Sequence, residues 1–301
     1  MKEGNSALFE LEVPLPDTYL KAQAQRLVGF KVRYERMHQN LRLLVDKEGL
    51  ERWSKKHYHA HIALLDSLLD RYPLVVFHGD VGTGKTATAE AASNELAIEL
   101  GKDAMLFKLS TRVRGSGNVG EMSTLINQAF DIVSKEAGKS RLSFLIIDEA
   151  DSLAASRSVN QSHHEDKVAV NTLIQKIDDI RRFSGRVLVI LCTNRFETLD
   201  PAILRRAAYD EEFLRPNKTE RRELFSLDCE GLGLADAVIE ELVELTGSQG
   251  PHKIGYTFSD IRTRLLPEAL AKAYPSRKIG HDDLIKAVSR IKPSPSMKTP
   301  A

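Results

Sequence analysis

The sequence contains few of the features that mark secreted or membrane proteins. Its 301 residues include only two cysteines, Cys192 and Cys229, which lie far apart in the sequence and indicate no framework of disulfides. A reducing compartment is therefore favoured. The N-terminus lacks the basic start and apolar stretch of a signal peptide, and no apolar run approaches the ~20 residues of a membrane-spanning helix. We expect a soluble, cytoplasmic protein.

An excess of charge of either sign is also missing. The chain has 43 Lys and Arg residues against 42 Asp and Glu residues, so its net charge is +1. No global electrostatic field attracts nucleic acid or a membrane surface, and we expect neither as a partner. The length suits one domain of ordinary size and a smaller second one.

What the sequence does contain is a phosphate-binding loop. The pattern G-x-x-x-x-G-K-[ST] is matched by Gly79, Asp80, Val81, Gly82, Thr83, Gly84, Lys85 and Thr86. An apolar run at 74–77 precedes the loop and an alanine-rich, helix-favouring stretch at 87–100 follows it, which is the strand–loop–helix order of such sites. Backbone N–H groups there surround phosphate oxygens at a helix start, where the macrodipole favours negative charge. The segment predicts nucleoside triphosphate binding.

Two side chains of this loop have predicted roles. Lys85 would meet the β- and γ-phosphates as a mobile point charge, and the Thr86 hydroxyl would complete the coordination of Mg²⁺. The alternative is a glycine turn with an exposed lysine. The strand before the loop and the helix after it argue against that alternative.

A second motif follows an apolar strand at 144–147, which ends in two adjacent carboxylates, Asp148 and Glu149. This arrangement looks like a hydrolytic Walker B element. Asp148 would hold Mg²⁺, directly or through water, and Glu149 would polarise the attacking water as general base. Taken alone, the pattern also fits a strand that simply meets its loop, but its place after a phosphate loop favours the catalytic interpretation.

A third apolar strand, at 187–192, ends in the polar pair Thr193 and Asn194. Asn194 can both donate and accept hydrogen bonds, so it is a candidate for positioning the γ-phosphate and the lytic water. Thr193 is the alternative for that role. Asparagine at the end of a strand is also a common turn former.

Apolar strands alternate with helical stretches from residue 74 onward, which argues for a parallel sheet with helices on both faces. After Pro216 the pattern is helical only, and the last residues are rich in proline and serine. The sequence predicts an N-terminal lead-in at 1–72 packed on the nucleotide domain, a large α/β nucleotide-binding domain at 73–215, a small helical lid domain at 216–292 and a disordered tail at 293–301.

Two arginines, Arg205 and Arg206, end a short helical turn that begins near residue 199. With the preceding motifs they make the chain resemble an AAA+ P-loop ATPase. The stretches 170–181 and 265–270 make it similar to the pachytene-checkpoint, or thyroid-receptor-interacting-protein, remodellers of HORMA-domain proteins. The resemblance covers about residues 74–273. It implies a five-stranded parallel sheet flanked by helices, a small helical lid, and ATP and Mg²⁺ as cofactors.

The resemblance also implies that the paired arginines act across a subunit boundary. In the family they reach the γ-phosphate of the neighbouring subunit as an arginine finger, which requires a ring arranged head to tail. Arg206 is the first candidate and Arg205 the second. The alternative is that one of them pairs with a nearby carboxylate such as Asp210 or Glu211.

Two further assignments come from the resemblance. A lid arginine that senses the nucleotide would be Arg262, with Arg264 in reserve, although this segment departs from the family pattern. A mobile pore loop that grips the client would contain Val119 and Gly120, where the family usually has an aromatic residue before the glycine, and Met122 would share the contact.

Together these features predict an Mg-ATP-dependent homohexameric remodeller. It would partly unfold a HORMA-domain client by pulling on a terminal peptide. The short lead-in resembles the bacterial branch, which accompanies cyclic-nucleotide-synthase anti-phage systems (CBASS) and releases the HORMA protein from the synthase. A DNA-handling loader or initiator ATPase is the alternative, against which the near-zero net charge argues. A scaffold that binds ATP without hydrolysing it is a third, against which Asp148 and Glu149 count.

Overall fold

The computed structural model describes residues 8–110, 121–138, 140–154 and 164–297. Within these, the chain forms two compact units. The first, here called the α/β unit, contains the described residues of 1–24, 31–78 and 86–211. The second, here called the helical unit, contains those of 25–30, 79–85 and 212–301. The phosphate loop up to Lys85 therefore groups with the C-terminal part of the chain, and the domain boundaries expected from the sequence stay predictions.

A six-stranded sheet has the order β1-β3-β4-β5-β2-β6. Its strands are β1 (Phe9–Leu15), β2 (Leu74–Gly79), β3 (Ala104–Leu109), β4 (Leu142–Ile147), β5 (Val187–Thr193) and β6 (Tyr209–Phe213). The pairs β3–β4, β4–β5 and β5–β2 are parallel, and β1 runs antiparallel to β3. The predicted α/β class is confirmed, with a helical C-terminal portion.

The expected number of five strands was too low, and the expected all-parallel arrangement fails at one edge. The lead-in supplies β1, which is antiparallel. The edge strand β6 has the sequence YDEEF, in which exposed carboxylates alternate with buried residues. Such a strand has no apolar run, so the pattern used to find the central strands misses it.

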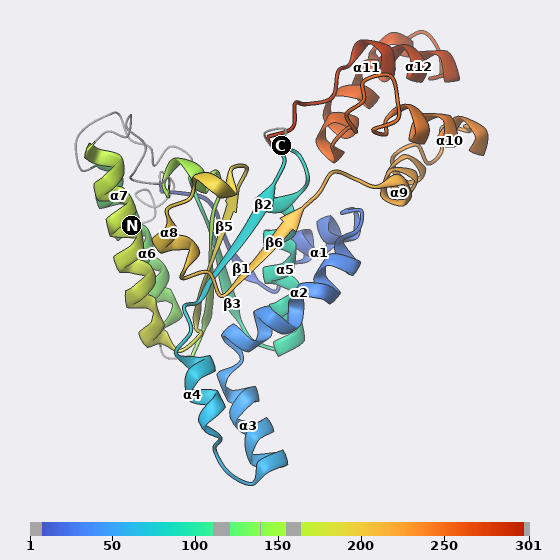
Figure 1. The fold of residues 1–301 in the computed structure, drawn as a ribbon. Helices are drawn as coiled ribbons and strands as arrows, with labels where there is room; N and C mark the ends of the chain where they lie inside the picture. The colour runs from blue at the N-terminus through green and yellow to red at the C-terminus, as the bar shows by residue number, and fades with distance from the viewer. Residues whose placement is uncertain (1–7, 111–120, 139, 155–163, 298–301) are drawn as a thin grey trace. The chain divides into compact units, whose positions relative to one another are not determined.

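The central strands are buried on both faces, which explains their continuous apolar sequences. Every residue of β4 and of β5 is buried. Helices α6 (Glu121–Ala137) and α7 (His164–Ile180) lie side by side against one face of the sheet, and α5 (Lys85–Leu100) lies on the opposite side (Figure 1). Apart from Ser143 in β4 and Lys108 in β3, the polar groups of β3, β4, β5 and β2 lie near the ends of the strands, because a buried polar group without a partner is costly.

Four helices of the lead-in precede β2: α1 (Thr18–Gln25), α2 (Phe30–Val45), α3 (Lys47–Tyr58) and α4 (Ala63–Leu69). The backbone N–H of Asp17 donates to Asn94 Oδ1 at 2.7 Å, and Asn94 Nδ2 donates back to the Asp17 carbonyl at 3.2 Å. Arg42 also contacts Glu99, at 3.1 Å. The lead-in is thus attached by polar contacts to the C-terminal half of α5, at Asn94 and at Glu99.

In the helical unit, α9 (Lys218–Asp228), α10 (Asp236–Leu245), the π-helical η5 (Asp260–Leu265), α11 (Leu266–Ala273) and α12 (His281–Arg290) surround their own apolar core. Helix α9 begins with a capping box in which Asn217 and Glu220 each accept the other's backbone N–H at 3.0 Å. The buried Tyr256 hydroxyl donates to the Val288 carbonyl at 3.0 Å, and burial raises the pKa of that tyrosine to about 12.

The end of the chain differs from the disordered tail expected at 293–301. Ser294 donates from its backbone N–H and from its hydroxyl to the Asp260 carboxylate, at 3.0 and 2.7 Å. Composition alone suggested disorder because proline and serine bury little apolar surface. Specific hydrogen bonds to a buried carboxylate hold the segment instead, at least through residue 297.

Short one-turn 3₁₀ helices connect several elements: η2 (Ala150–Ser152), η3 (Arg181–Phe183) and η4 (Phe196–Thr198), with the short helix α8 (Pro201–Leu204) after the last of them. Over the part of the chain that the structure describes, no helix combines the length and the apolar character needed to cross a bilayer.

Gly185 provides a stability test of the turn before β5. Its φ is +83°, and an added Cβ would lie 2.2 Å from the Leu44 carbonyl oxygen. We expect Gly185→Ala to lower the free energy of unfolding by about 2–4 kcal/mol, because the left-handed backbone and the clash both add cost. The matched control is Gly101→Ala, at φ +60° with nothing within 4 Å of the added atom, for which about 1 kcal/mol is expected. Denaturant unfolding measures both; equal losses would contradict the clash.

Candidate nucleotide site

The phosphate loop adopts a backbone that requires glycine at two positions. Gly79 has φ +137°, and a Cβ there would lie 2.1 Å from the Phe213 carbonyl oxygen. Gly82 has φ +75°, and its Cβ would lie 2.7 Å from Ser259 Cβ and 2.8 Å from Thr257 Oγ1. The loop therefore runs tightly against other segments of the helical unit, where no side chain fits.

Lys85 folds back over the loop. Its Nζ donates to the carbonyl oxygens of Gly79 at 2.9 Å and of Asp80 at 2.7 Å. Thr83, which is fully buried, donates from Oγ1 to the same Asp80 carbonyl at 2.8 Å. The buried ammonium group is thus held at the loop by backbone acceptors, which keeps a positive charge where an anionic ligand would need it.

The α/β unit brings the two predicted magnesium ligands into contact. Thr86 Oγ1 donates to Asp148 Oδ2 at 2.7 Å. The hard oxygen donors of a threonine and an aspartate suit Mg²⁺, which needs only one or two protein carboxylates when phosphate oxygens and water complete its shell. Among the described residues no group of three or more His, Cys, Asp or Glu side chains is placed to hold a metal ion.

Glu149 has an unusual backbone conformation. Its φ and ψ of +48° and +42° place it in the left-handed region, and its N–H donates to Asp148 Oδ1 at 2.8 Å. A glutamate pays an energetic cost for that conformation, and such costs are concentrated at functional sites. The turn formed by Asp148 and Glu149 directs the chain from β4 into η2.

The end of β5 lies beside the end of β4, because Ile147 is paired with Leu191 in a parallel register. Thr193 Oγ1 donates to Asp151 Oδ1 at 3.0 Å and accepts the Arg195 N–H, also at 3.0 Å. Asn194 follows, half-buried. The hydroxyl of Thr193 is therefore engaged with protein groups, which leaves Asn194 as the better candidate for contact with a ligand.

Sequence reasoning missed His78. In β2 this residue is paired with Thr193, its ring stacks on Phe196 with centroids 4.1 Å apart, and its Nε2 lies 3.3 Å from Asp210 Oδ2. The available signal was a single histidine at the end of an otherwise apolar strand, directly before the phosphate loop. His78 holds the end of β2, which leads into the phosphate loop, against η4.

Comparison with known proteins adds to this geometry. The family model for the ATPase family associated with various cellular activities (AAA) matches residues 75–217. A CD-NTase-associated protein 6 from Escherichia coli strain KTE188 is 52% identical over 295 residues, which cover 98% of this chain and 99% of that protein. The protein of the same name from E. coli strain MS 115-1 is 40% identical, with 98% of each chain covered.

The chain belongs to the AAA ATPases, in the family of CD-NTase-associated protein 6. A chain of the solved E. coli MS115-1 HORMA:CdnC:Trip13 complex superposes with a TM-score of 0.89 at 40% identity, covering 99% of this chain and 100% of that one. Rhizobiales Trip13 gives a TM-score of 0.71 at 34% identity, with coverages of 96% and 100%. The resemblance drawn from the motifs is confirmed.

The two candidate arginine fingers of this AAA ATPase differ in their surroundings. Arg206 donates from Nε and Nη2 to the two carboxylate oxygens of Asp178, at 2.6 and 2.9 Å, and its guanidinium carbon lies 5.2 Å from the centre of the Tyr72 ring. The hydrogen bonds to Asp178 raise the pKa of Arg206. Arg205 is exposed at the end of α8 and, among the described residues, forms no ion pair.

A paired arginine was expected, but with other partners. Asp178 on α7 holds Arg206, whereas Glu211 contacts Arg36 and Asp210 lies near His78. Asp178 is 28 residues from Arg206 in sequence, so only the packing of α7 beside α8 brings the two together. Of the two arginines, Arg206 is the one held in an ion pair.

The lid arginines are also paired inside the helical unit. Arg262 donates to both oxygens of Asp228, at 2.6 and 3.0 Å, and Arg264 donates to Asp260 Oδ1 at 3.0 Å. Both lie on η5, whose π-helical turns change the faces on which the two side chains project relative to an α-helix. A nucleotide-sensing role for Arg262 stays a prediction, and it requires exchange of the Asp228 partner.

The predicted pore loop is described only at its end. Val119 and Gly120 lie outside the described residues. Met122 was expected to share the contact with the client, and this expectation is wrong: its side chain is 7% exposed and packs in the apolar core between α6 and the sheet. An amphipathic helix begins at residue 121, so Met122 occupies the face that the sheet covers.

The arginine pair yields a stability test. Arg206→Ala removes two charge-assisted hydrogen bonds, but Asp178 is 41% exposed. We therefore expect a loss of only about 1–2 kcal/mol in the free energy of unfolding. The control Arg205→Ala changes an exposed side chain and is expected to stay within about 0.5 kcal/mol of the parent chain. Denaturant unfolding distinguishes them, and the reverse ranking would refute the assignment of Arg206 to a structural ion pair.

Proposed function

We propose that this AAA ATPase binds Mg-ATP at residues 79–86 and 148 and hydrolyses it. The observation that carries the proposal is the contact between Thr86 and Asp148, with Glu149 held beside it in a strained turn. These are the oxygen ligands and the base that phosphoryl transfer to water needs. Family membership makes ATP the expected nucleotide; the metal and the individual roles are part of the proposal.

The loop residues bind and orient the triphosphate. Gly79, Gly82 and Gly84 allow backbone N–H groups to approach the phosphates, with Asp80, Val81 and Thr83 completing the turn. Lys85 exchanges its carbonyl partners for phosphate oxygens of the ligand, so its charge is supplied without further desolvation. Thr86 and Asp148 would hold Mg²⁺, which neutralises phosphate charge when bound.

Glu149 acts as the general base. Its carboxylate takes the proton of the attacking water, and Asn194 orients that water and the γ-phosphate through its amide. Both side chains follow the carboxyl ends of adjacent parallel strands, so they are supported by rigid elements. The product phosphate leaves with the water oxygen, and the leaving group is ADP.

We further propose a homohexameric ring in which Arg205 completes the site of the neighbouring subunit. Arg206 was the first candidate from sequence, but its guanidinium is already satisfied by Asp178. An arginine finger must be available to a ligand in trans, and Arg205 is exposed. Arg206 then positions α8 by tying it to α7.

The client is proposed from the relatives. The similar E. coli MS115-1 chain was solved in a HORMA:CdnC:Trip13 complex, and the E. coli relatives are named CD-NTase-associated protein 6. We propose that this chain, too, acts on a HORMA-domain protein and releases it from a nucleotide synthase in an anti-phage system. ATP hydrolysis would drive the partial unfolding of that client.

Mixing two inactive variants tests the shared site. Glu149→Gln is expected to lower the hydrolysis rate about 100-fold or more while ATP still binds, and Arg205→Ala to lower it at least as far. In a mixed ring some seams combine an intact Glu149 with an intact Arg205, so activity should reappear. Phosphate release measures it.

The control mixture is Glu149→Gln with Lys85→Ala, two changes in the same half of the site, for which no recovery is expected. Absence of recovery in the first mixture would refute a site shared between subunits. Full activity of Arg205→Ala alone would refute the choice of Arg205.

Client release provides a separate test of the pore loop. Val119→Ala is expected to spare ATP hydrolysis and to abolish disassembly of a labelled complex between a HORMA-domain protein and its synthase, because the grip on the peptide is lost. The control is Val168→Ala, a valine on α7 that is 37% exposed. Normal disassembly by the Val119 variant would refute the pore assignment.

A further inference from the structure

The C-terminal residues 294–297 are attached to the phosphate loop through Asp80. The Met297 N–H donates to Asp80 Oδ1 at 2.8 Å, and the Ser296 hydroxyl lies 3.3 Å from both Asp80 oxygens. All of these residues belong to the helical unit. The carboxylate of a loop residue is therefore covered by a segment more than 200 residues later in the chain.

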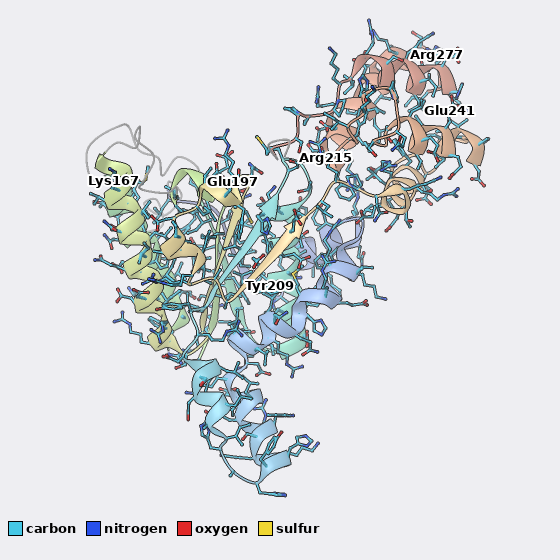
Figure 2. All side chains as sticks on the ribbon, in the orientation of Figure 1. Lys167, Glu197, Tyr209, Arg215, Glu241 and Arg277 are labelled. Atoms are coloured by element: carbon cyan, nitrogen blue, oxygen red, sulfur yellow. The ribbon has the colours of Figure 1, made fainter. Side chains whose placement is uncertain are left out.

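Arg215 joins the same carboxylate to the rest of the segment. Its Nε donates to Asp80 Oδ2 at 2.6 Å, its Nη1 to the Gly255 carbonyl at 2.6 Å and its Nη2 to the Ser294 carbonyl at 2.9 Å. Figure 2 labels Arg215 on the connection that follows β6. The side chains of Arg215 and Asp80 are only 14% and 12% exposed, so this is a desolvated ion pair with fixed geometry.

Asp260 forms a second attachment point for residues 294–297, at Ser294. Asp260, which is 1% exposed, accepts the N–H and the hydroxyl of Ser294 as well as the Thr257 N–H at 3.0 Å. The neighbouring Ser259 N–H donates to the Gly82 carbonyl at 3.1 Å. The phosphate loop is thus restrained at residue 80 by the chain end and at residue 82 by the start of η5.

The charges explain why the contact matters for an anionic ligand. A free carboxylate on the loop would repel a triphosphate. Burial alone would raise the pKa of Asp80, but the Arg215 guanidinium and the Met297 and Ser296 donors outweigh it and lower that pKa, so the group is ionised and neutralised by its partners. Removal of those donors would leave a less compensated negative charge on a less restrained loop.

We propose that residues 294–297 form a strap that positions the phosphate loop for ATP, with Asp80 as the point of attachment. The inference rests on the proposed binding of Mg-ATP by this loop. The strap acts through the loop and does not touch the reacting atoms, so it is a positioning element. A loop already fixed in its binding conformation pays less entropy when the ligand arrives. The strap should therefore govern nucleotide affinity more than the rate of the chemical step.

Two nested truncations test the strap. Deletion of residues 296–301 removes both direct donors from the strap to Asp80 but keeps the contacts of Ser294. Deletion of residues 298–301 keeps every contact described above and is the matched control. With a fluorescent non-hydrolysable ATP analogue and Mg²⁺ as the probe, we expect the longer deletion to weaken binding by about fivefold to tenfold, the size of one or two lost hydrogen bonds. The KM for ATP should rise in parallel, with kcat within about twofold.

Equal affinity of the two truncated chains for the ATP analogue would overturn the strap. Tighter binding by the longer deletion would also overturn it, because the segment would then inhibit nucleotide binding instead of supporting it. Failure of the intact chain and of the control to bind the analogue at all would overturn the proposed function as well. If the longer deletion lowers the melting temperature, Ser296→Ala in the full-length chain decides, because it removes one donor of the strap and leaves the loop and Arg215 unchanged: a rise in KM supports the strap, and an unchanged KM overturns it. Ser296→Thr, which keeps the hydroxyl, should retain the parent KM.

Discussion

Burial of four parallel strands on both faces is the constraint on which the rest of the α/β unit depends. Strands β3, β4, β5 and β2 consist almost entirely of apolar side chains, so most of their polar groups appear where the strands end. Parallel register places the ends of β4 and β5 side by side, and with them Asp148, Glu149 and Asn194. The hydrogen bond between Thr86 and Asp148 then joins the start of α5 to the same edge.

Ion pairing within the chain decides which cations remain available to a ligand. Arg206 donates two hydrogen bonds to Asp178, and Arg262 donates two to Asp228. A guanidinium bound in this bidentate way must lose both bonds before it can contact a phosphate. Among the residues that the structure describes, Arg205 forms no ion pair that would have to break first. The proposal of Arg205 as the arginine finger rests on this difference.

The phosphate loop is supported by parts of the chain that are remote in sequence. Gly82 packs against Thr257 and Ser259, and Asp80 is tied to Arg215 and to the chain end. Glycine-rich loops are intrinsically flexible, so their conformation must be imposed by neighbours. In this protein the helical unit imposes it, which offers a physical route by which changes in that unit alter nucleotide affinity.

The sequence by itself determined the α/β class, the family and the positions of Lys85 and Asp148, because these depend on local spacing and on apolar runs that any parallel sheet must have. It did not determine the edge strand β6, because Tyr209–Phe213 is amphipathic and short. Tertiary structure alone decided the burial of Met122 and the partners of Arg206 and Asp80. Those outcomes depend on contacts between segments 28 to 217 residues apart, and no local pattern encodes which distant side chain will neutralise a given charge.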